Sequence, residues 1–169
     1  MTRRSGRGVA FTSRRSLVRV QHCPPALMSN QFSQGIEVVG SAIIENSQEE
    51  ILLVKSPKWN NKWLMPGGHI ETGEKIEESI LREVREETGL TLISKGIINF
   101  GELINSKDFH RAAHFIYFDI YCQSEKDIIN LDNKELIEFK WLKPQAALKM
   151  DLAESYQETI EKFIRYKNS

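Results

Sequence analysis

The chain has 169 residues, 40% of them hydrophobic, which suits one domain with a sizeable core. Its 23 basic and 23 acidic side chains cancel, and no apolar run reaches the length of a transmembrane helix. The two cysteines, Cys23 and Cys122, provide neither a disulfide framework nor a CxxC metal site. We therefore expect a soluble, cytoplasmic protein that does not interact with membranes.

The first 28 residues differ in composition from the rest. They contain six arginines and no acidic residue, which leaves 17 basic against 23 acidic side chains in the remainder. We expect 1–28 to be a disordered tail or an over-extended start, and 29–169 to form the domain. An organellar transit peptide is an alternative. Nucleic-acid binding is disfavoured, because the tail has one aromatic residue for stacking and the body is acidic.

Two strands are predicted at the start of the domain. Residues Ile36 to Glu45 and Ile51 to Lys55 are rich in aliphatic side chains, and the polar segment Asn46 to Glu50 between them is typical of a turn. We therefore expect a β-hairpin. Further on, Pro66 breaks regular structure, and the two glycines after it allow a tight bend that brings backbone carbonyls close to a ligand.

An amphipathic helix is predicted after this bend. Three aliphatic residues fall within about 80° of one another on a helix of 3.6 residues per turn, which makes them a core-facing stripe: Ile76, Ile80 and Val84. We expect the helix to be entered at Thr72 and Gly73 and to end just before Gly89. Arg82 stands one turn from both Glu78 and Glu86, so it can hold a carboxylate on either side.

Two glutamates on this helix need an explanation. Glu83 and Glu87 lie at the edge of the apolar stripe, and burying two like charges one turn apart is costly. A divalent cation between them would turn this repulsion into attraction. Carboxylates, a carbonyl and water are ligands that suit Mg²⁺ or Mn²⁺. Without the neighbouring glycine bend, a solvated charged face would be the better interpretation of so many glutamates.

The rest of the chain predicts more strands and a second helical layer. The expected elements are one or two strands within Leu90 to Ile104, a strand from Ala113 to Cys122, a strand from Glu138 to Leu142, a helical turn at Gln145 to Met150 and a helix from Leu152 to Tyr166. The strand ending at Cys122 is apolar on both sides, as in the centre of a sheet covered on both faces. We therefore expect an α/β sandwich with a mixed β-sheet between helices.

The glycine bend and the helix together carry a specific motif. Gly68, five residues, Glu74, seven residues and then the segment Arg82 to Leu90, which reads REVREETGL, resembles the Nudix box without a departure. The preceding Pro-Gly-Gly and the later Phe139 to Leu142 also resemble the pattern of that family. The resemblance extends over residues 36 to 166.

The resemblance implies an α/β/α fold and a metal-dependent hydrolase. It assigns metal ligands at the following positions: Gly68 through its carbonyl, Glu83, Glu86 and Glu87. Arg82 would hold the glutamates in place, with Glu74 in support. For the general base, Glu86 is our first candidate; the alternatives are Glu102, Glu135 and Glu138.

Substrate contacts are predicted from charge and aromatic character. The candidates are Lys55, Trp63, Arg111 and Glu135, and Trp59 is a further aromatic that could stack on a base. The expected substrate is a small-molecule nucleotide, either a nucleoside triphosphate or a modified nucleotide. Hydrolysis of ADP-ribose, of a nucleotide sugar or of a dinucleoside polyphosphate is an alternative, as is a ligand-binding sensor without catalysis. A homodimer is a further expectation from the family.

Overall fold

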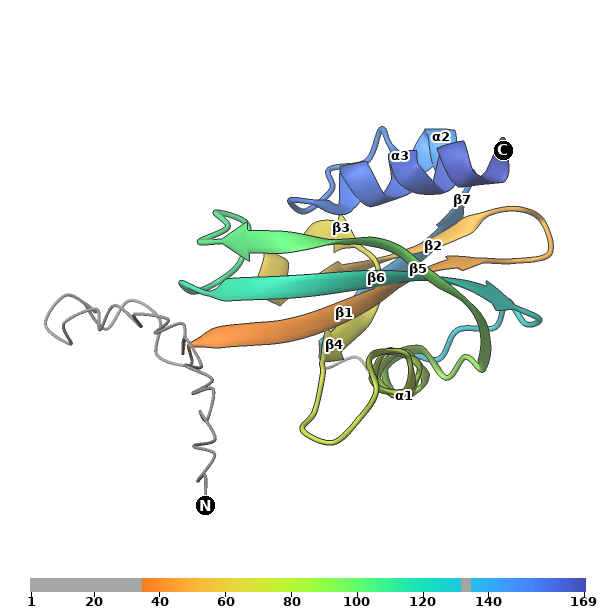
Figure 1. The fold of residues 1–169 in the computed structure, drawn as a ribbon. Helices are drawn as coiled ribbons and strands as arrows, with labels where there is room; N and C mark the ends of the chain where they lie inside the picture. The colour runs from red at the N-terminus through yellow and green to blue at the C-terminus, as the bar shows by residue number, and fades with distance from the viewer. Residues whose placement is uncertain (1–34, 132–134) are drawn as a thin grey trace, which may run out of the picture.

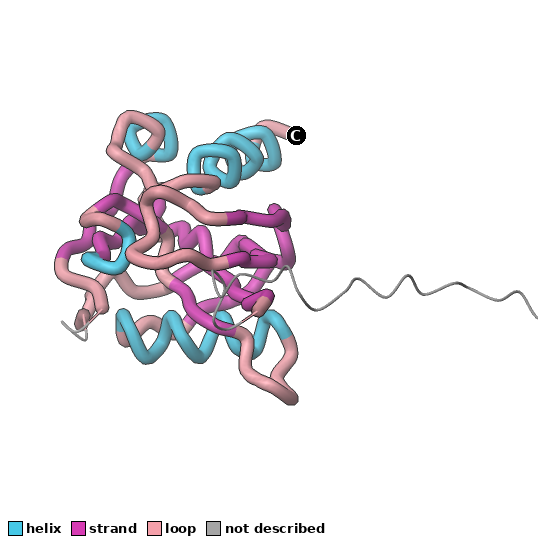
Figure 2. The backbone as a smooth tube through the Cα atoms, turned by 90° about the vertical axis from the view of Figure 1, so that its left-hand side faces the viewer, coloured by secondary structure: helices cyan, strands magenta, loops and turns pink. Residues whose placement is uncertain are grey.

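The computed structural model describes residues 35–131 and 135–169, which form three layers (Figure 1). A β-sheet lies in the middle, helix α1 covers one face, and helices α2 and α3 cover the other, as the view in Figure 2 also shows. This confirms the predicted sandwich. The Arg-rich segment 1–28 lies outside the described residues.

The elements follow one another in the order strands, helix, strands, helices. Their bounds are β1 Ile36–Glu45, β2 Ile51–Ser56, the 3₁₀ turn η2 Pro57–Trp59, β3 Lys62–Leu64, β4 Gly67–His69, α1 Ile76–Thr88, β5 Leu92–Ile104, β6 His114–Ser124, β7 Glu138–Leu142, α2 Pro144–Ala147 and α3 Tyr156–Lys167. The predicted hairpin is formed by β1 and β2, which pair antiparallel.

The sheet is mixed, as predicted. Its main path runs in the order β3, β2, β1, β6, β5, with β4 paired to β1 and β7 paired to β2. β1 and β6 run parallel, and β6 runs antiparallel to β5. The strand that was expected at the centre of the sheet, β6, therefore has neighbours on both sides.

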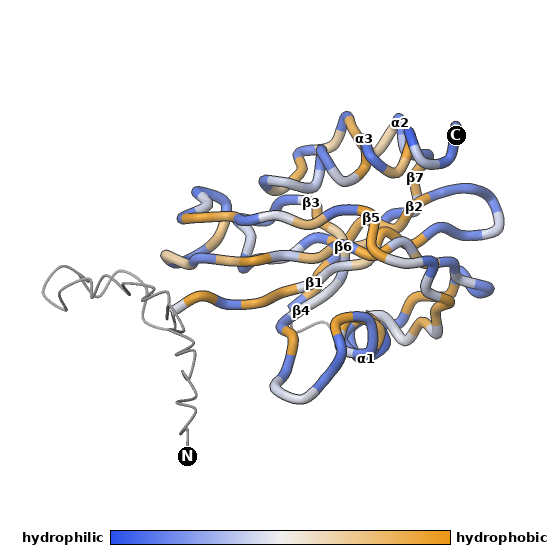
Figure 3. Tube along the Cα trace, in the orientation of Figure 1, coloured by the Kyte–Doolittle hydropathy of each residue, from blue (hydrophilic) through white to orange (hydrophobic). Residues whose placement is uncertain are grey.

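The core is divided by the sheet into two clusters. On the α1 side, Ile80 and Val84 pack against strand residues that include Ile120 and Cys122. On the α3 side, Ile160 and Phe163 pack against a set that includes Tyr121. Successive residues of β6 thus enter opposite clusters, which explains why its sequence is apolar on both faces (Figure 3).

Both long helices begin later than predicted. α1 starts at Ile76, not at Thr72 and Gly73, and Gly73 has a positive φ of 93°, which a helix does not allow. α3 starts at Tyr156, not at Leu152. Its predicted first turn is extended instead, because the Trp63 N–H donates to the Asp151 carbonyl and the Ala153 N–H donates to the Trp63 carbonyl. Within the described residues, no helix is long and apolar enough to cross a membrane.

Candidate active site

The glycine bend packs directly against β1 and α1, and only glycine fits there. A Cβ on Gly67 would lie 2.1 Å from the carbonyl oxygen of Gly40 on β1. A Cβ on Gly68 would lie 2.6 Å from the Glu83 carboxylate carbon on α1. The two glycines therefore bring the backbone of β4 into contact with the glutamate face of α1, as the Pro-Gly-Gly sequence predicted.

Two of the three candidate metal-binding glutamates meet this backbone. Glu87 is 8% exposed, and its Oε2 accepts a hydrogen bond of 3.0 Å from the Gly67 N–H. Glu83 is partly buried against Gly68. The third, Glu86, points outward with a side chain that is 64% exposed. The buried edge of the helix is thus occupied by carboxylates, as its periodicity predicted.

Arg82 orients the carboxylates from one side. Its guanidinium binds both oxygens of Glu74, at 2.9 and 3.0 Å, and Nη1 donates to Glu83 at 2.9 Å. Nη1 also lies 3.8 Å from Glu86. This fork lowers the pKa of Glu74 to about 2. The predicted pair between Arg82 and Glu78 is replaced by one between Lys75 and Glu78, at 2.9 Å.

The donor atoms at the bend are suited to a hard divalent cation. Carboxylate oxygens of Glu83 and Glu87 lie beside the backbone of Gly67 and Gly68, and such oxygen donors are what Mg²⁺ and Mn²⁺ prefer. Among the described residues, no three acidic or imidazole side chains converge as a ready metal-binding group. Glu83 is instead paired with Arg82, and Glu86 lies in solvent. The residues at the bend therefore fit such a cation in the chemistry of their donor atoms.

A cavity of about 370 Å³ opens beside the bend. Gly67, Gly68 and His69 contribute to its lining. Its walls carry a group of aromatic side chains: Trp59, Phe109, Phe115, Tyr117 and Tyr156. Trp59 and Phe109 lie in contact, with ring centroids 4.7 Å apart. The cavity lining thus combines aromatic side chains with polar groups of the bend, as pockets for nucleotides and other small molecules do.

Two basic side chains also belong to the cavity lining. Arg111 and His69 both line the cavity. Arg111 makes two hydrogen bonds of 2.7 Å to the two oxygens of Glu37, and His69 Nε2 lies 2.8 Å from one of them. The Arg111 guanidinium is the main cause that lowers the pKa of Glu37 to about 2.

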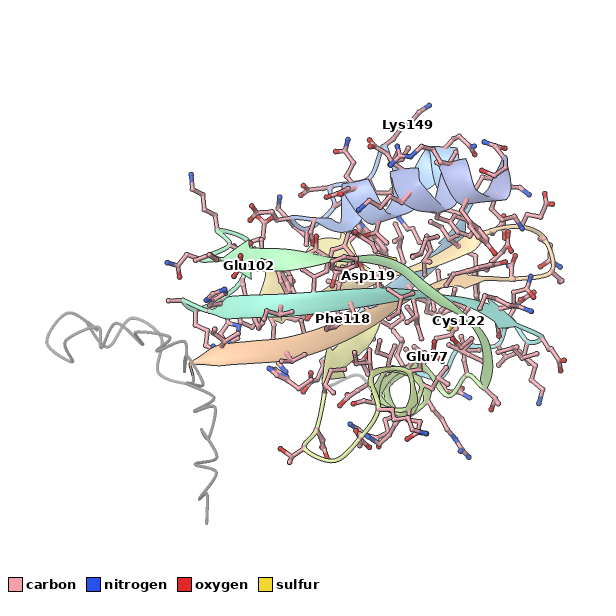
Figure 4. The ribbon with its side chains drawn as sticks, viewed as in Figure 1. Glu77, Glu102, Phe118, Asp119, Cys122 and Lys149 are labelled. Carbon is pink, nitrogen blue, oxygen red and sulfur yellow. The ribbon has the colours of Figure 1, made fainter. Side chains whose placement is uncertain are left out.

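Asp119 is a buried acid that the sequence did not single out. It is 2% exposed, and it accepts hydrogen bonds from the hydroxyls of Ser41, at 2.6 Å, and Thr159, at 2.5 Å. Burial raises its pKa to about 6. Figure 4 labels it on β6, next to Phe118 in the chain. The signal that could have found it is a single acidic residue inside an otherwise apolar strand.

Some of the predicted substrate contacts line the cavity, and others do not. Arg111 and Glu135 line the cavity, and so does Trp59. Lys55 lies outside the lining, 3.6 Å from Glu138, and Trp63 is 5% exposed in the core on the α3 side. The reason is strand alternation, because the neighbouring Leu64 faces the cavity and Trp63 must therefore face away from it.

The three alternative candidates for the general base lie in different places relative to the cavity. Glu135 lines the cavity, where its carboxylate lies 2.5 Å from Lys58. Glu102, labelled on β5 in Figure 4, lies 2.6 Å from His114 and outside the cavity lining. Glu138 pairs with Lys55 on β2. Of these three, Glu135 is the one placed to reach a molecule in the cavity.

Comparison with known proteins identifies the family. The NUDIX domain matches residues 37–163, which is most of the chain. The nucleoside triphosphatase NudI of Escherichia fergusonii is 32% identical over 105 residues, which cover 59% of this chain and 74% of that protein. The same enzyme of Escherichia coli strain SE11 is 30% identical over the same length, with the same coverage of both chains.

Solved structures agree with this assignment. The crystal structure of the MutT protein from Methanosarcina mazei Go1 superposes with a TM-score of 0.67 at 26% identity, covering 79% of this chain and 96% of that one. A NUDIX hydrolase from Nitrosomonas europaea gives a TM-score of 0.63 at 24% identity, covering 78% and 90% of the two chains, and shares the fold. The chain therefore belongs to the Nudix family of hydrolases.

Proposed function

We propose that this chain hydrolyses a phosphoanhydride bond of a nucleoside triphosphate or a modified nucleotide, with Mg²⁺ or Mn²⁺ as cofactor. One observation carries the proposal: Glu83 and Glu87 meet the Gly67–Gly68 bend, and this bend lines an aromatic cavity. The relatives named nucleoside triphosphatase support the choice of substrate class.

The Gly68 carbonyl and the carboxylates of Glu83, Glu86 and Glu87 would hold the cation. When bound, a divalent cation neutralises phosphate charge and lowers the pKa of a coordinated water. The role of Arg82 is orientation, because its fork to Glu74 fixes the guanidinium that in turn holds Glu83. Without this brace, the carboxylates on this face of α1 would repel one another.

We infer how the substrate would lie in the cavity. A nucleobase would stack on Trp59 in the aromatic part, and the phosphates would lie towards Arg111 and the glycine bend. Glu86 is our first candidate for the general base, because its carboxylate is exposed at the edge of the glutamate face. Glu135, on the cavity wall, is the alternative.

The test is a panel of substrates with two variants. Nucleoside di- and triphosphates, ADP-ribose, nucleotide sugars and dinucleoside polyphosphates are assayed with Mg²⁺ for released phosphate or pyrophosphate. On the best substrate, Glu83→Gln and Glu87→Gln are each expected to lower kcat by about 100-fold or more, because each removes a charge that would help to hold the cation. Normal rates in both variants would refute the proposal.

A matched control lies on the same helix. Glu77, labelled at α1 in Figure 4, is exposed, and Glu77→Gln removes the same charge without touching the glycine bend. We expect it to keep the full rate. A homodimer and a cytoplasmic location remain predictions from the sequence, and analytical ultracentrifugation tests the first of them.

A further inference from the structure

Glu37 is a buried acid that the proposed mechanism does not use. It is 7% exposed and lies on β1, two residues before Val39, which lines the cavity. Residues two positions apart on a strand share one face of the sheet, so Glu37 and Val39 are on the same side. Glu37 itself is absent from the cavity lining, and it contacts two residues that belong to the lining.

Those two residues are Arg111 and His69, and both carry nitrogen atoms that suit an anion. Arg111 binds the two Glu37 oxygens through its two terminal nitrogens, each at 2.7 Å, in the parallel arrangement that fixes the plane of a guanidinium. The same guanidinium lies 5.2 Å from the ring centroid of Phe109. The Glu37 carboxylate and the Phe109 ring thus both keep the Arg111 side chain in place, although Arg111 belongs to a loop.

His69 is fixed by the same carboxylate. Its Nε2 lies 2.8 Å from Glu37 Oε2, and its backbone follows Gly68 directly in β4. The side chain is 55% exposed, and His69 belongs to the cavity lining, so a ligand can reach its ring. One buried acid therefore organises two basic side chains from separate segments beside the glycine bend.

We propose that Glu37 is a positioning residue, which holds Arg111 and His69 in place to bind the phosphate chain of the substrate. This inference rests on the proposed function for the identity of the substrate. It adds a residue outside the Nudix box and assigns it to phosphate binding. The acid can act in this way because it is not part of the cavity lining, whereas Arg111 and His69, which it contacts, both are.

The central variant is Glu37→Gln, which keeps the shape of the side chain and removes its charge. We expect KM for the best nucleotide to rise about tenfold or more, because about one charge-assisted hydrogen bond to the substrate is lost. The fall in kcat should be smaller. Arg111→Lys keeps the positive charge but cannot form the two-point contact, so it should show the same defect. The double variant should be no worse than either single one, because the two residues act as a unit.

Binding of inorganic tripolyphosphate provides a readout that does not depend on turnover. Titration calorimetry should show affinity for tripolyphosphate falling about tenfold in Glu37→Gln and in Arg111→Lys. Glu158→Gln is the matched control, because it removes an exposed partner of Lys162 on α3, and it should leave both KM and this affinity unchanged. Thermal unfolding identifies any variant that fails to fold, and Arg111→Lys then decides.

The outcomes separate the two proposals. If the wild type hydrolyses a nucleotide but KM and tripolyphosphate affinity are unchanged in both Glu37→Gln and Arg111→Lys, the role of Glu37 is wrong and the proposed function stands. If the wild type hydrolyses nothing on the panel, the proposed function is wrong, and calorimetry still decides whether Glu37 organises a phosphate site. A loss of thermal stability with unchanged KM and affinity would also overturn the positioning role.

Discussion

The two glycines of the bend should fail in different ways when each is replaced by alanine. In Gly68→Ala the new Cβ meets the end of the Glu83 side chain at 2.6 Å, and this side chain can turn away. In Gly67→Ala the new Cβ meets the backbone of β1, at 2.1 Å from the Gly40 oxygen, and a central strand cannot yield. The first change would displace a carboxylate of the proposed cation site, and the second would push the sheet apart.

The magnitudes follow from these contacts. An ordinary contact needs about 3.4 Å, so Glu83 must retreat by about 1 Å in Gly68→Ala, and a misplacement of this size costs about 100-fold in rate. Stability should change little, because the side chain moves towards solvent. In Gly67→Ala, overpacking against a backbone should cost about 3 kcal/mol, which lowers Tm by about 10 °C for a domain of this size.

The assay measures kcat on the best nucleotide and Tm for both variants and the wild type. We expect Gly68→Ala to melt within about 2 °C of the wild type with a much reduced kcat, because little packing is lost. Gly67→Ala should melt far lower. A fully active Gly68→Ala, or a Gly67→Ala variant as stable as the wild type, would show that the close packing of the bend does not control the site.

Two further predictions concern the cavity walls. Asp119 has a pKa raised to about 6 by burial, above its ordinary value of 3.8, so its contribution to stability is complete below pH 3.8 and is lost as the pH rises through 6. When the pH is lowered from 7.5 to 5, the free energy of unfolding measured with urea should therefore rise by about 1 kcal/mol more in the wild type than in Asp119→Asn. Equal rises in the two proteins would show that the pKa of Asp119 is not raised. Trp59→Ala should raise KM about tenfold through lost stacking and leave kcat nearly unchanged, measured on the same nucleotide; an unchanged KM would place the base elsewhere.

The sequence predicted the fold well where periodicity and packing agree. The limits of β1 and β7, the central place of β6 and the sandwich itself followed from apolar patterns, and the structure confirms them. The start of α3 was wrong because a non-local contact decided it. Backbone groups around Leu152 pair with Trp63 on β3, and no local pattern reveals a partner so far along the chain.

The candidate site was predictable in its motif and less so in its surroundings. Glu83 and Glu87 could be placed at the glycine bend because helix angle and loop adjacency are local properties. Trp63 was favoured over Trp59 for substrate contact, but strand alternation turns it into the core. Glu37 and Asp119 were missed, because a buried acid is recognised by its partners, and these come from distant segments.

The parallel pairing of β1 with β6 has a consequence for folding kinetics. It joins Val38 to Ile116 and Ser41 to Asp119, and no contact between these strands can form until the intervening chain has closed as a loop. Such pairings form slowly, because loop closure must precede any gain from contacts. Helix α1 and the β1–β2 hairpin can each form from neighbouring residues. During refolding, the ability to bind the nucleotide should therefore return last, after most of the helical circular dichroism signal.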